Sequence, residues 1–413
     1  MELTREEERM LNGDCGEPCR WALSLQVETG KFFGATRMLS VRSAHMMADI
    51  EILGPSGVAF LERLMEQGAR ARVLATLNPG SVDFAAAERL RQDPAMVEFE
   101  RKVIALCRKM GFIALGSCVL YQTAYQPHRG EHLAWGDTGT VIWANSVIGA
   151  RSNFESGPAA LAAALTGRVP DYGFHRDECR AGTVLVDVTT ELADLADWGA
   201  LGALIGRQLT DYWAVPVISV LNRSPLPDEL KHFGAALAAW GSIAMFHMPP
   251  ITTEARTVAE AFGGRTPERT IRVGAEEIDG VYRWYVPDRR EVDLVVFSAP
   301  QLSVFELRML AELLDGRTVH ENTRLIVTTD AMARAAGERL GYVDAIERAG
   351  GLVLDGTCFY HMAIGDMRRT FGWRSVLTNS AKLANIVPSY QYQPILRRTA
   401  TCIEAAVQGR LAE

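Results

Sequence analysis

Residues able to do acid–base or metal chemistry are concentrated between positions 116 and 175. Among the residues of this stretch are a thiol, imidazoles, carboxylates, guanidinium groups and amides, including Cys118, His128, His132, His175, Glu131, Asp137, Arg129, Arg151, Asn145 and Asn153. So many polar groups among apolar segments are costly to bury unless they are paired. We therefore interpret the stretch as the lining of a site.

Two cysteines stand at the ends of short apolar segments that we predict to be strands. Cys118 and Cys358 each follow such a segment, and a small residue precedes each of them. Two thiolates at strand ends could bind a metal ion or an iron–sulfur cluster, although they could equally be two unrelated buried thiols. No phosphate-binding P-loop, dinucleotide-binding glycine motif or nucleophile elbow is present in the chain.

Other candidate residues have a chemical and a structural interpretation. Lys382 could hold a carboxylate or phosphate group, or could be a surface lysine at a helix start, where its charge would oppose the helix dipole. His45 could be a base or a hydrogen-bonded loop histidine. Residues 78–79 could form only a turn, and Asp137, next to Thr138, could form only an Asx turn.

An alternation of apolar strands and helices must position these residues. We expect strands at 72–77, 112–115, 183–188, 214–221, 242–247, 294–297, 325–328 and 351–354, and helices at 56–68, 84–110, 192–205, 230–240, 304–314 and 330–340. Apolar strands separated by helices indicate an α/β protein with mainly parallel sheets. Ligands bind at the carboxyl ends of such strands, where the candidate residues lie, so we expect one composite site.

The composition fits a globular chain of 413 residues with a net charge of −7 and no basic stripe, which argues against a nucleic-acid or membrane partner. The N-terminus lacks the features of a signal peptide, and no apolar run is long enough to span a membrane. Seven scattered cysteines indicate a reducing, cytoplasmic location. We expect two units, 1–180 and 181–413, with the polar segment 249–290 as an excursion or linker.

Several motifs resemble one known family in the same order along the chain. They are LTREEERMLNGDCGEP at the start, SVRSAH, TLNP, a long block containing GEHLAW, ANSVIGARSN and GPAALAAALTGRVPDYG, and TNSAK near the end. The chain is similar to the catalytic large subunit of the aconitase X family, a branch of the aconitase superfamily. The similarity extends over the whole chain, and its central block is long and specific.

The resemblance implies an aconitase-like catalytic core and a dehydratase acting on a small hydroxy acid, such as a hydroxyproline or a phosphorylated mevalonate. It implies a separate small swivel-domain subunit, because no segment of this chain resembles that domain. It assigns catalysis to Lys382, Asp137 and His45, and substrate binding to Asn78, Pro79, Asp137, Thr138, Ser380 and Lys382.

The resemblance also implies an iron–sulfur cluster held by three cysteines, of which two are Cys118 and Cys358. The third family cysteine lies in a GCPHLS-like motif, which reads SAPQLS at residues 298–303. Ala299 therefore stands where the family has cysteine, and Gln301 where it has histidine. Alanine has no ligand atom. Either another residue supplies the third ligand, or another metal is bound in place of the cluster, or no cluster is bound.

Three functional hypotheses follow. The first is a hydro-lyase subunit with an altered or lost cluster. The second is an iron-free isomerase or other lyase on the same scaffold. The third is a non-catalytic binding or regulatory subunit, which the retention of Lys382, Asn78 and Asp137 argues against. Elimination of water beside a carboxylate needs a base, an acid for the leaving hydroxide and an anchor for the carboxylate.

Overall fold

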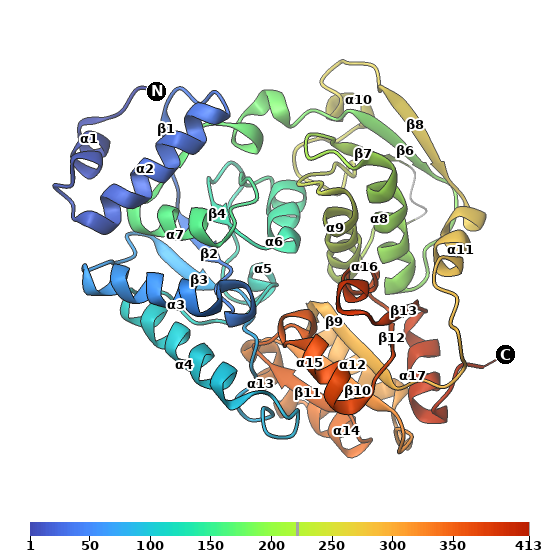
Figure 1. Ribbon diagram of the computed structural model, residues 1–413. Helices are drawn as coiled ribbons and strands as arrows, with labels where there is room; N and C mark the ends of the chain where they lie inside the picture. Colours follow the sequence, from blue (N-terminus) through green and yellow to red (C-terminus); the bar gives the residue numbers. More distant parts are fainter. Residues whose placement is uncertain (220–222, 413) are drawn as a thin grey trace.

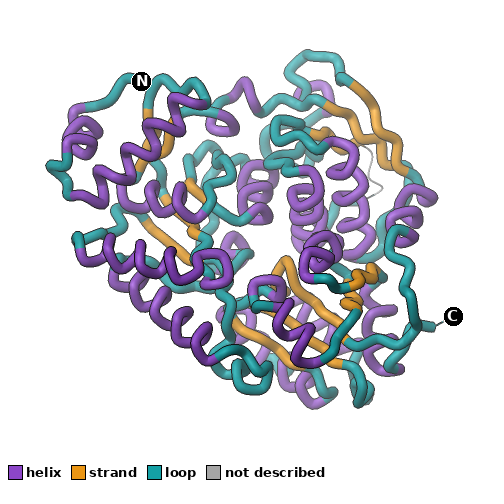
Figure 2. The backbone as a smooth tube through the Cα atoms, viewed as in Figure 1, coloured by secondary structure: helices purple, strands orange, loops and turns teal. Residues whose placement is uncertain are grey.

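The computed structural model describes residues 1–219 and 223–412, which form three α/β units arranged around a common centre (Figure 1). Every strand pair between named strands is parallel except β1 (Met38–Ser40) with β5 (Arg168–Pro170). In Figure 2, helices lie outside the strands of the first unit, whereas strands of the second unit run along the outer edge of the molecule. The predicted α/β class with mainly parallel sheets is confirmed. A swivel-type fourth unit is not among the described residues.

The first unit contains a three-stranded sheet in the order β3-β2-β4. Its strands are β2 (Ser43–Met46), β3 (Leu74–Leu77) and β4 (Ala134–Trp135), and its helices are α1 (Arg5–Asn12), α2 (Glu17–Phe32), α3 (Ile50–Glu66), α4 (Pro94–Lys109), α5 (Leu120–Thr123), α6 (Thr138–Trp143) and α7 (Gly157–Thr166). The register places His45 beside Thr76 and Trp135. The chemistry-bearing residue of β2 thus lies in the centre of this sheet.

The second unit contains the sheet β7-β6-β8. Its elements are β6 (Val184–Val188), α8 (Leu195–Leu209), β7 (Pro216–Ser219), α9 (Pro227–Gly241), α10 (Val258–Ala261), β8 (Arg269–Val273) and α11 (Ala275–Arg283). Helices α8 and α9 approach closely, since a Cβ at Gly202 would lie 2.4 Å from the Phe233 carbonyl oxygen. Part of the predicted strand 214–221 lies outside the described residues.

The third unit is a five-stranded parallel sheet in the order β11-β10-β9-β12-β13. Its elements are β9 (Leu294–Leu302), α12 (Val304–Leu313), β10 (Arg324–Thr329), α13 (Ala331–Arg339), α14 (Tyr342–Arg348), β11 (Leu352–Asp355), α15 (Ile364–Phe371), β12 (Ser375–Thr378), α16 (Ala381–Ile386), β13 (Gln393–Leu396) and α17 (Thr399–Gln408). Every residue of the central strand β9 is buried. This strand carries Ala299 and Gln301.

Four sequence predictions differ from the structure. The segment 249–290 supplies β8, which pairs with β6, and α11, so these residues belong to the second unit rather than to an excursion. The predicted helix 84–110 begins only at Pro94, because Asp93 caps α4. The predicted strands 112–115 and 242–247 are reduced to single bridges at Ile113 and His247. No helix within the described ranges is long and apolar enough to cross a membrane.

Candidate active site

Three chain segments meet at a junction of glycine backbones. The Gly80 amide donates to the Gly356 carbonyl over 2.9 Å. A Cβ at Gly116, whose φ is +63°, would lie 2.8 Å from the Gly356 Cα atom. Larger residues would separate these segments, since two backbones approach this closely only without side chains. The junction brings the ends of β3 and β11 together with the segment leading to Cys118.

Beside this junction, Lys382 and Asp137 form a buried ion pair. The Lys382 Nζ atom lies 3.4 Å from Asp137 Oδ1 and donates to Thr138 Oγ1 over 3.3 Å. Asp137 caps α6, because its Oδ2 atom accepts from the amides of Gly139 and Thr140 at 2.7 and 3.2 Å. The side chains of Lys382 and Asp137 are only 5% and 4% exposed. The predicted Asx turn and the predicted charged site therefore coexist.

The pair keeps both partners charged. Burial alone would raise the pKa of Asp137, but Lys382, His45 and the two amide donors outweigh it and lower that pKa. Burial would likewise lower the pKa of Lys382, but Asp137 and the two nearby thiols raise it above its ordinary value. A stable ammonium and a stable carboxylate thus face the same space at neutral pH.

His45 lies close enough to Asp137 to be influenced by its charge, but burial dominates and lowers the pKa of His45 to about 4. Its Nε2 atom lies 3.3 Å from Asn78 Oδ1, which can only accept, so Nε2 carries the proton. Its Nδ1 atom then accepts from the Thr76 hydroxyl at 2.8 Å. His45 is therefore a neutral imidazole with both nitrogens engaged, and it fixes the orientation of Asn78.

Cys118, Cys358 and Ala299 come together as the family resemblance implies. The Gln301 amide donates to Cys118 Sγ at 3.4 Å, and Ser298 Oγ lies 3.7 Å from Cys358 Sγ, so Ala299 lies between residues that contact the two thiols. Burial raises the pKa of Cys358 to about 11 and that of Cys118 still further.

The donor set does not fit a cluster held by three thiolates. Within the described ranges, no group of three histidine, cysteine, aspartate or glutamate residues is spaced to hold a metal ion. The third position is the methyl group of Ala299, which is 1% exposed and offers no ligand atom. Iron–sulfur clusters of this kind are bound by thiolates or by the occasional imidazole, neither of which stands at position 299.

Gln301 instead connects the strand ends by hydrogen bonds. Its Oε1 atom accepts from the Cys118 amide at 2.9 Å. Its Nε2 group lies 2.9 to 3.0 Å from the carbonyl oxygens of Gly116, Thr329 and Thr357, so its two hydrogens are shared among three acceptors. The side chain is fully buried. In the sequence, Gln301 is visible only as a departure from the family motif, because the partners that define its structural role are backbone groups far away in the sequence.

Most of the other predicted substrate-binding residues already use their polar groups in hydrogen bonds within the protein. Ser380 Oγ donates to the Ala299 carbonyl and accepts from the Leu383 amide at 3.1 Å, so this hydroxyl caps α16. The Pro79 carbonyl accepts from His361 Nδ1 at 3.3 Å. Only Asn78 keeps a buried polar atom without a hydrogen-bond partner, its Nδ2 amide group, among the six predicted binding residues.

Much of the 116–175 stretch stabilises the fold rather than lining the site. Asn145 exchanges two hydrogen bonds of 2.9 Å with the backbone of Ser152, and Asn153 bonds the backbone of Tyr172 and Phe174. His132 and His175 contact each other through Nδ1 at 3.0 Å. Asn145 and Asn153 therefore hold the backbone, and His132 and His175 line a separate cavity with Arg151, whereas Cys118, Asp137 and Thr138 lie at the candidate site.

Comparison with known proteins identifies the scaffold. Models of the first, second and third aconitase X domains match residues 1–178, 182–283 and 292–408. The phosphomevalonate dehydratase large subunit of Methanocaldococcus jannaschii is 34% identical over 94% of this chain and 96% of its own length. The cis-3-hydroxy-L-proline dehydratase of Pseudomonas aeruginosa is 34% identical over 98% of this chain and 70% of its own length.

A solved structure agrees with these sequence matches. The crystal structure of Thermococcus kodakaraensis aconitase X in its holo-form superposes with a TM-score of 0.88 and 33% identity, covering 98% of this chain and 100% of that one. The family predicted from the motifs is confirmed by three domain models, full-length relatives and a solved fold. The chain belongs to the aconitase X family.

Proposed function

We propose that this chain is the catalytic large subunit of a hydro-lyase that removes water from a small hydroxy acid. The observation that carries the proposal is the buried Lys382–Asp137 pair beside Thr138, at the meeting point of the strand ends. The relatives named as dehydratases of phosphomevalonate and of cis-3-hydroxy-L-proline support the reaction class. Burying a charged pair without a chemical use is an expensive way to stabilise a fold.

The pair supplies both halves of an elimination. Asp137 removes the proton from the carbon next to the substrate carboxylate, and the Lys382 ammonium protonates the hydroxide that leaves the neighbouring carbon as water. The products are a carbon–carbon double bond, a neutral Asp137 and a neutral Lys382. A proton then returns from Asp137 to Lys382 across their 3.4 Å contact, which restores both groups. Acid and base on one side of the substrate favour syn elimination.

The remaining residues hold this arrangement. Thr138 Oγ1 accepts from Lys382 at 3.3 Å and directs the ammonium. The neutral His45 orients Asn78, whose unpaired Nδ2 group can donate to a substrate carboxylate or hydroxyl. His45 is thus a positioning residue in this scheme rather than the base, since neither nitrogen keeps a free lone pair.

A separate small subunit that closes the site is the partner we propose. Two relatives named as large subunits, from Methanocaldococcus jannaschii and Thermococcus kodakarensis, are covered by this chain along 96% and 100% of their length. We also propose a cytoplasmic location, because all seven cysteines are free thiols, which is typical of a reducing compartment. Cys118, Cys358 and Cys402 lie in buried hydrophobic clusters.

Hydrogen–deuterium exchange at the carbon next to the carboxylate tests the reaction class. The complex of the chain with its small subunit is incubated in deuterated water with hydroxy-acid candidates, and deuterium uptake and water loss are measured separately. We expect both, and Lys382→Met should abolish water loss while Lys102→Met, at an exposed pair with Glu62, should not.

Each alternative hypothesis has its own outcome in this experiment. Deuterium uptake without water loss in the unmodified complex would indicate an isomerase. Binding without uptake would indicate a non-catalytic subunit. Full activity of a folded Lys382→Met complex would remove Lys382 from the mechanism.

A further inference from the structure

Tyr360 is a half-buried tyrosine that lies beside the proposed catalytic pair. The Lys382 Nζ atom lies over its ring, 5.9 Å from the ring centre, which is within the range of a cation–π contact. Burial raises the pKa of the phenol well above its ordinary value, and the nearby Cys358, Asp137 and Cys118 groups add to this effect. The ammonium, the carboxylate and both thiols therefore lie around this one side chain.

A short 3₁₀ turn, Phe359–His361, sets the backbone position of Tyr360. The His361 amide donates to the Cys358 carbonyl over 2.9 Å, and the Phe359 amide donates to Ser298 Oγ over 3.1 Å. The His361 and Tyr360 rings are in contact, with 4.2 Å between their centroids, and the Tyr360 ring packs against a buried hydrophobic cluster of the third unit. The place of the ring is thus fixed by contacts that do not involve its hydroxyl group.

The hydroxyl group of Tyr360 is free. Among residues 1–219 and 223–412, no group forms a hydrogen bond with it. Its oxygen is not one of the fully buried polar atoms that lack a partner, and the residue is half-buried, so the hydroxyl reaches open space. A phenol is neutral at pH 7 and has one proton to donate. Because tyrosine hydroxyls inside proteins usually have a partner, a ligand oxygen would complete this one.

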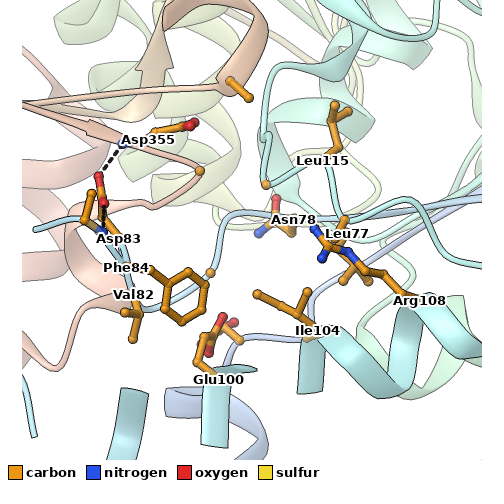
Figure 3. Close-up of a pocket in the computed structure, with 18 residues that line it drawn as sticks. Leu77, Asn78, Val82, Asp83, Phe84, Glu100, Ile104, Arg108, Leu115 and Asp355 are labelled. Atoms are coloured by element: carbon orange, nitrogen blue, oxygen red, sulfur yellow. Dashed lines mark hydrogen bonds between the residues drawn. The ribbon is translucent and has the colours of Figure 1, made fainter. Parts of the chain in front are cut away.

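A neighbouring cavity of about 420 Å³, shown in Figure 3, does not include this hydroxyl. Asn78 lines that cavity, whereas Tyr360, Asp137 and Lys382 do not. Asn78 follows β3 and Tyr360 follows β11, so the two free donors near the catalytic pair come from different segments. They can therefore hold two different oxygen atoms of one substrate.

From this arrangement we infer that the Tyr360 hydroxyl donates a hydrogen bond to the substrate oxygen that leaves as water. The inference rests on the proposed hydro-lyase function. As the bond between carbon and this oxygen breaks, the Lys382 proton moves to the oxygen and water departs. Tyr360 keeps its own proton, and its O–H dipole stabilises the negative charge that develops on the oxygen. The Asn78 amide is then left for the substrate carboxylate.

The position of Lys382 selects the leaving oxygen as the partner of Tyr360. The ammonium that protonates this oxygen lies over the Tyr360 ring, so one substrate oxygen between them can contact both groups. Ala299 supplies no ligand atom for a Lewis acid beside the two thiols, so the departing hydroxide depends on hydrogen-bond donors at this place. Tyr360 supplies such a donor without adding a charge.

Isothermal titration calorimetry on the full chain and on Tyr360→Phe tests this contact without requiring turnover. Each probe is a hydroxy acid beside its deoxy analogue: cis-3-hydroxy-L-proline with L-proline, 3-hydroxybutyrate with butyrate, and malate with succinate. The unmodified chain should bind at least one hydroxy acid more tightly than its deoxy analogue. Tyr360→Phe should reduce this preference about five- to tenfold, which corresponds to one neutral hydrogen bond, and should not change the affinity for the deoxy analogue.

Tyr342→Phe is the matched control. Tyr342, at the start of α14, is also a half-buried tyrosine of the third unit whose hydroxyl has no hydrogen bond within the described residues. This variant should keep the full preference for the hydroxy acid. Both variants should unfold at the same urea concentration as the unmodified chain, because each removes a hydroxyl without a partner in the protein.

Turnover of the complex with the proposed small subunit separates this inference from the proposed function. In Tyr360→Phe, kcat for water loss should fall roughly tenfold or more. In contrast, kcat for the corresponding chloro acid should not change, since chloride leaves without a proton. If the unmodified complex loses no water but Tyr360→Phe still loses the hydroxyl preference, the proposed function fails and the contact stands.

Three results would overturn the inference. The first is that no hydroxy acid binds more tightly than its deoxy analogue. The second is that Tyr360→Phe keeps the full preference. The third is that Tyr360→Phe slows the loss of chloride as much as the loss of water, which would indicate a merely structural role.

Discussion

Replacing Lys382 by methionine should remove the positive charge that stabilises Asp137 while keeping a similar unbranched side chain. The two side chains are 5% and 4% exposed, so solvent screens their interaction little. Breaking a buried ion pair by removing one partner costs about 3–5 kcal/mol of unfolding free energy. Asp137 retains its amide donors at 2.7 and 3.2 Å, so we expect the lower end, about 3 kcal/mol.

The loss should depend on pH with a defined sign. In the unmodified chain the pKa of Asp137 is lowered, so its contribution to stability is present above the unfolded pKa and is lost as pH falls through the folded value. Without Lys382, burial dominates and the folded pKa of Asp137 rises above its ordinary value. The variant should therefore be most destabilised near pH 7.5 and less so near pH 5, where Asp137 takes up a proton.

Urea denaturation of four chains at both pH values measures this effect. They are the unmodified chain, Lys382→Met, Asp137→Asn and the double variant. A fifth chain, Lys102→Met, is the control. It should change the free energy of unfolding by about 0.5 kcal/mol or less, because the pair of Lys102 with Glu62 is exposed. The double variant should lose less than the sum of the single variants, with a coupling of about 2 kcal/mol. A loss below about 1 kcal/mol at pH 7.5, or strict additivity, would refute the buried-pair reasoning.

Three further predictions concern single buried groups. Gln301→Ala should lower the free energy of unfolding by roughly 3–5 kcal/mol in urea denaturation, because it removes the partner of the Cys118 amide and of the Gly116 and Thr357 carbonyls, and a loss near zero would contradict its connecting role. Glu155→Gln should stabilise the chain by up to about 3 kcal/mol at pH 8 but not at pH 4.5. Burial raises the pKa of Glu155 to about 7, so the ionised carboxylate destabilises the folded chain increasingly as the pH rises. The His45 ring should stay neutral down to about pH 4 in an NMR titration, and a pKa near its ordinary value would contradict the burial argument.

The sequence predicted the features that depend on local pattern. Alternating apolar strands and helices gave the parallel α/β class, and the rule that ligands gather at strand ends placed Cys118 near Cys358. The family resemblance assigned both Asp137 and Lys382 to one site, and the structure brings them within 3.4 Å of each other although they lie 245 positions apart. These predictions succeeded because strand ends are set by local periodicity and by turns.

Features that depend on distant backbone groups were not predictable. Gln301 bonds the backbone of residues up to 185 positions away, and no sequence pattern marks those partners. The same reason explains why Asn145 and Asn153 resembled site residues, because their amide partners are invisible in the sequence. The segment 249–290 is polar partly because β8 exposes several of its side chains. Its sequence therefore lacks the apolar run by which we predicted the other strands, although β8 pairs with β6.

We propose that this aconitase X chain eliminates water through Lys382 and Asp137, without a cluster held at position 299. The most direct measurement is the turnover of the chain, in complex with the proposed small subunit, as a function of its iron and sulfide content after chelation and after anaerobic reconstitution. We predict turnover that does not change with iron content and almost no iron retained per chain. Turnover that appears only when several iron and sulfide atoms are bound per chain would contradict the claim.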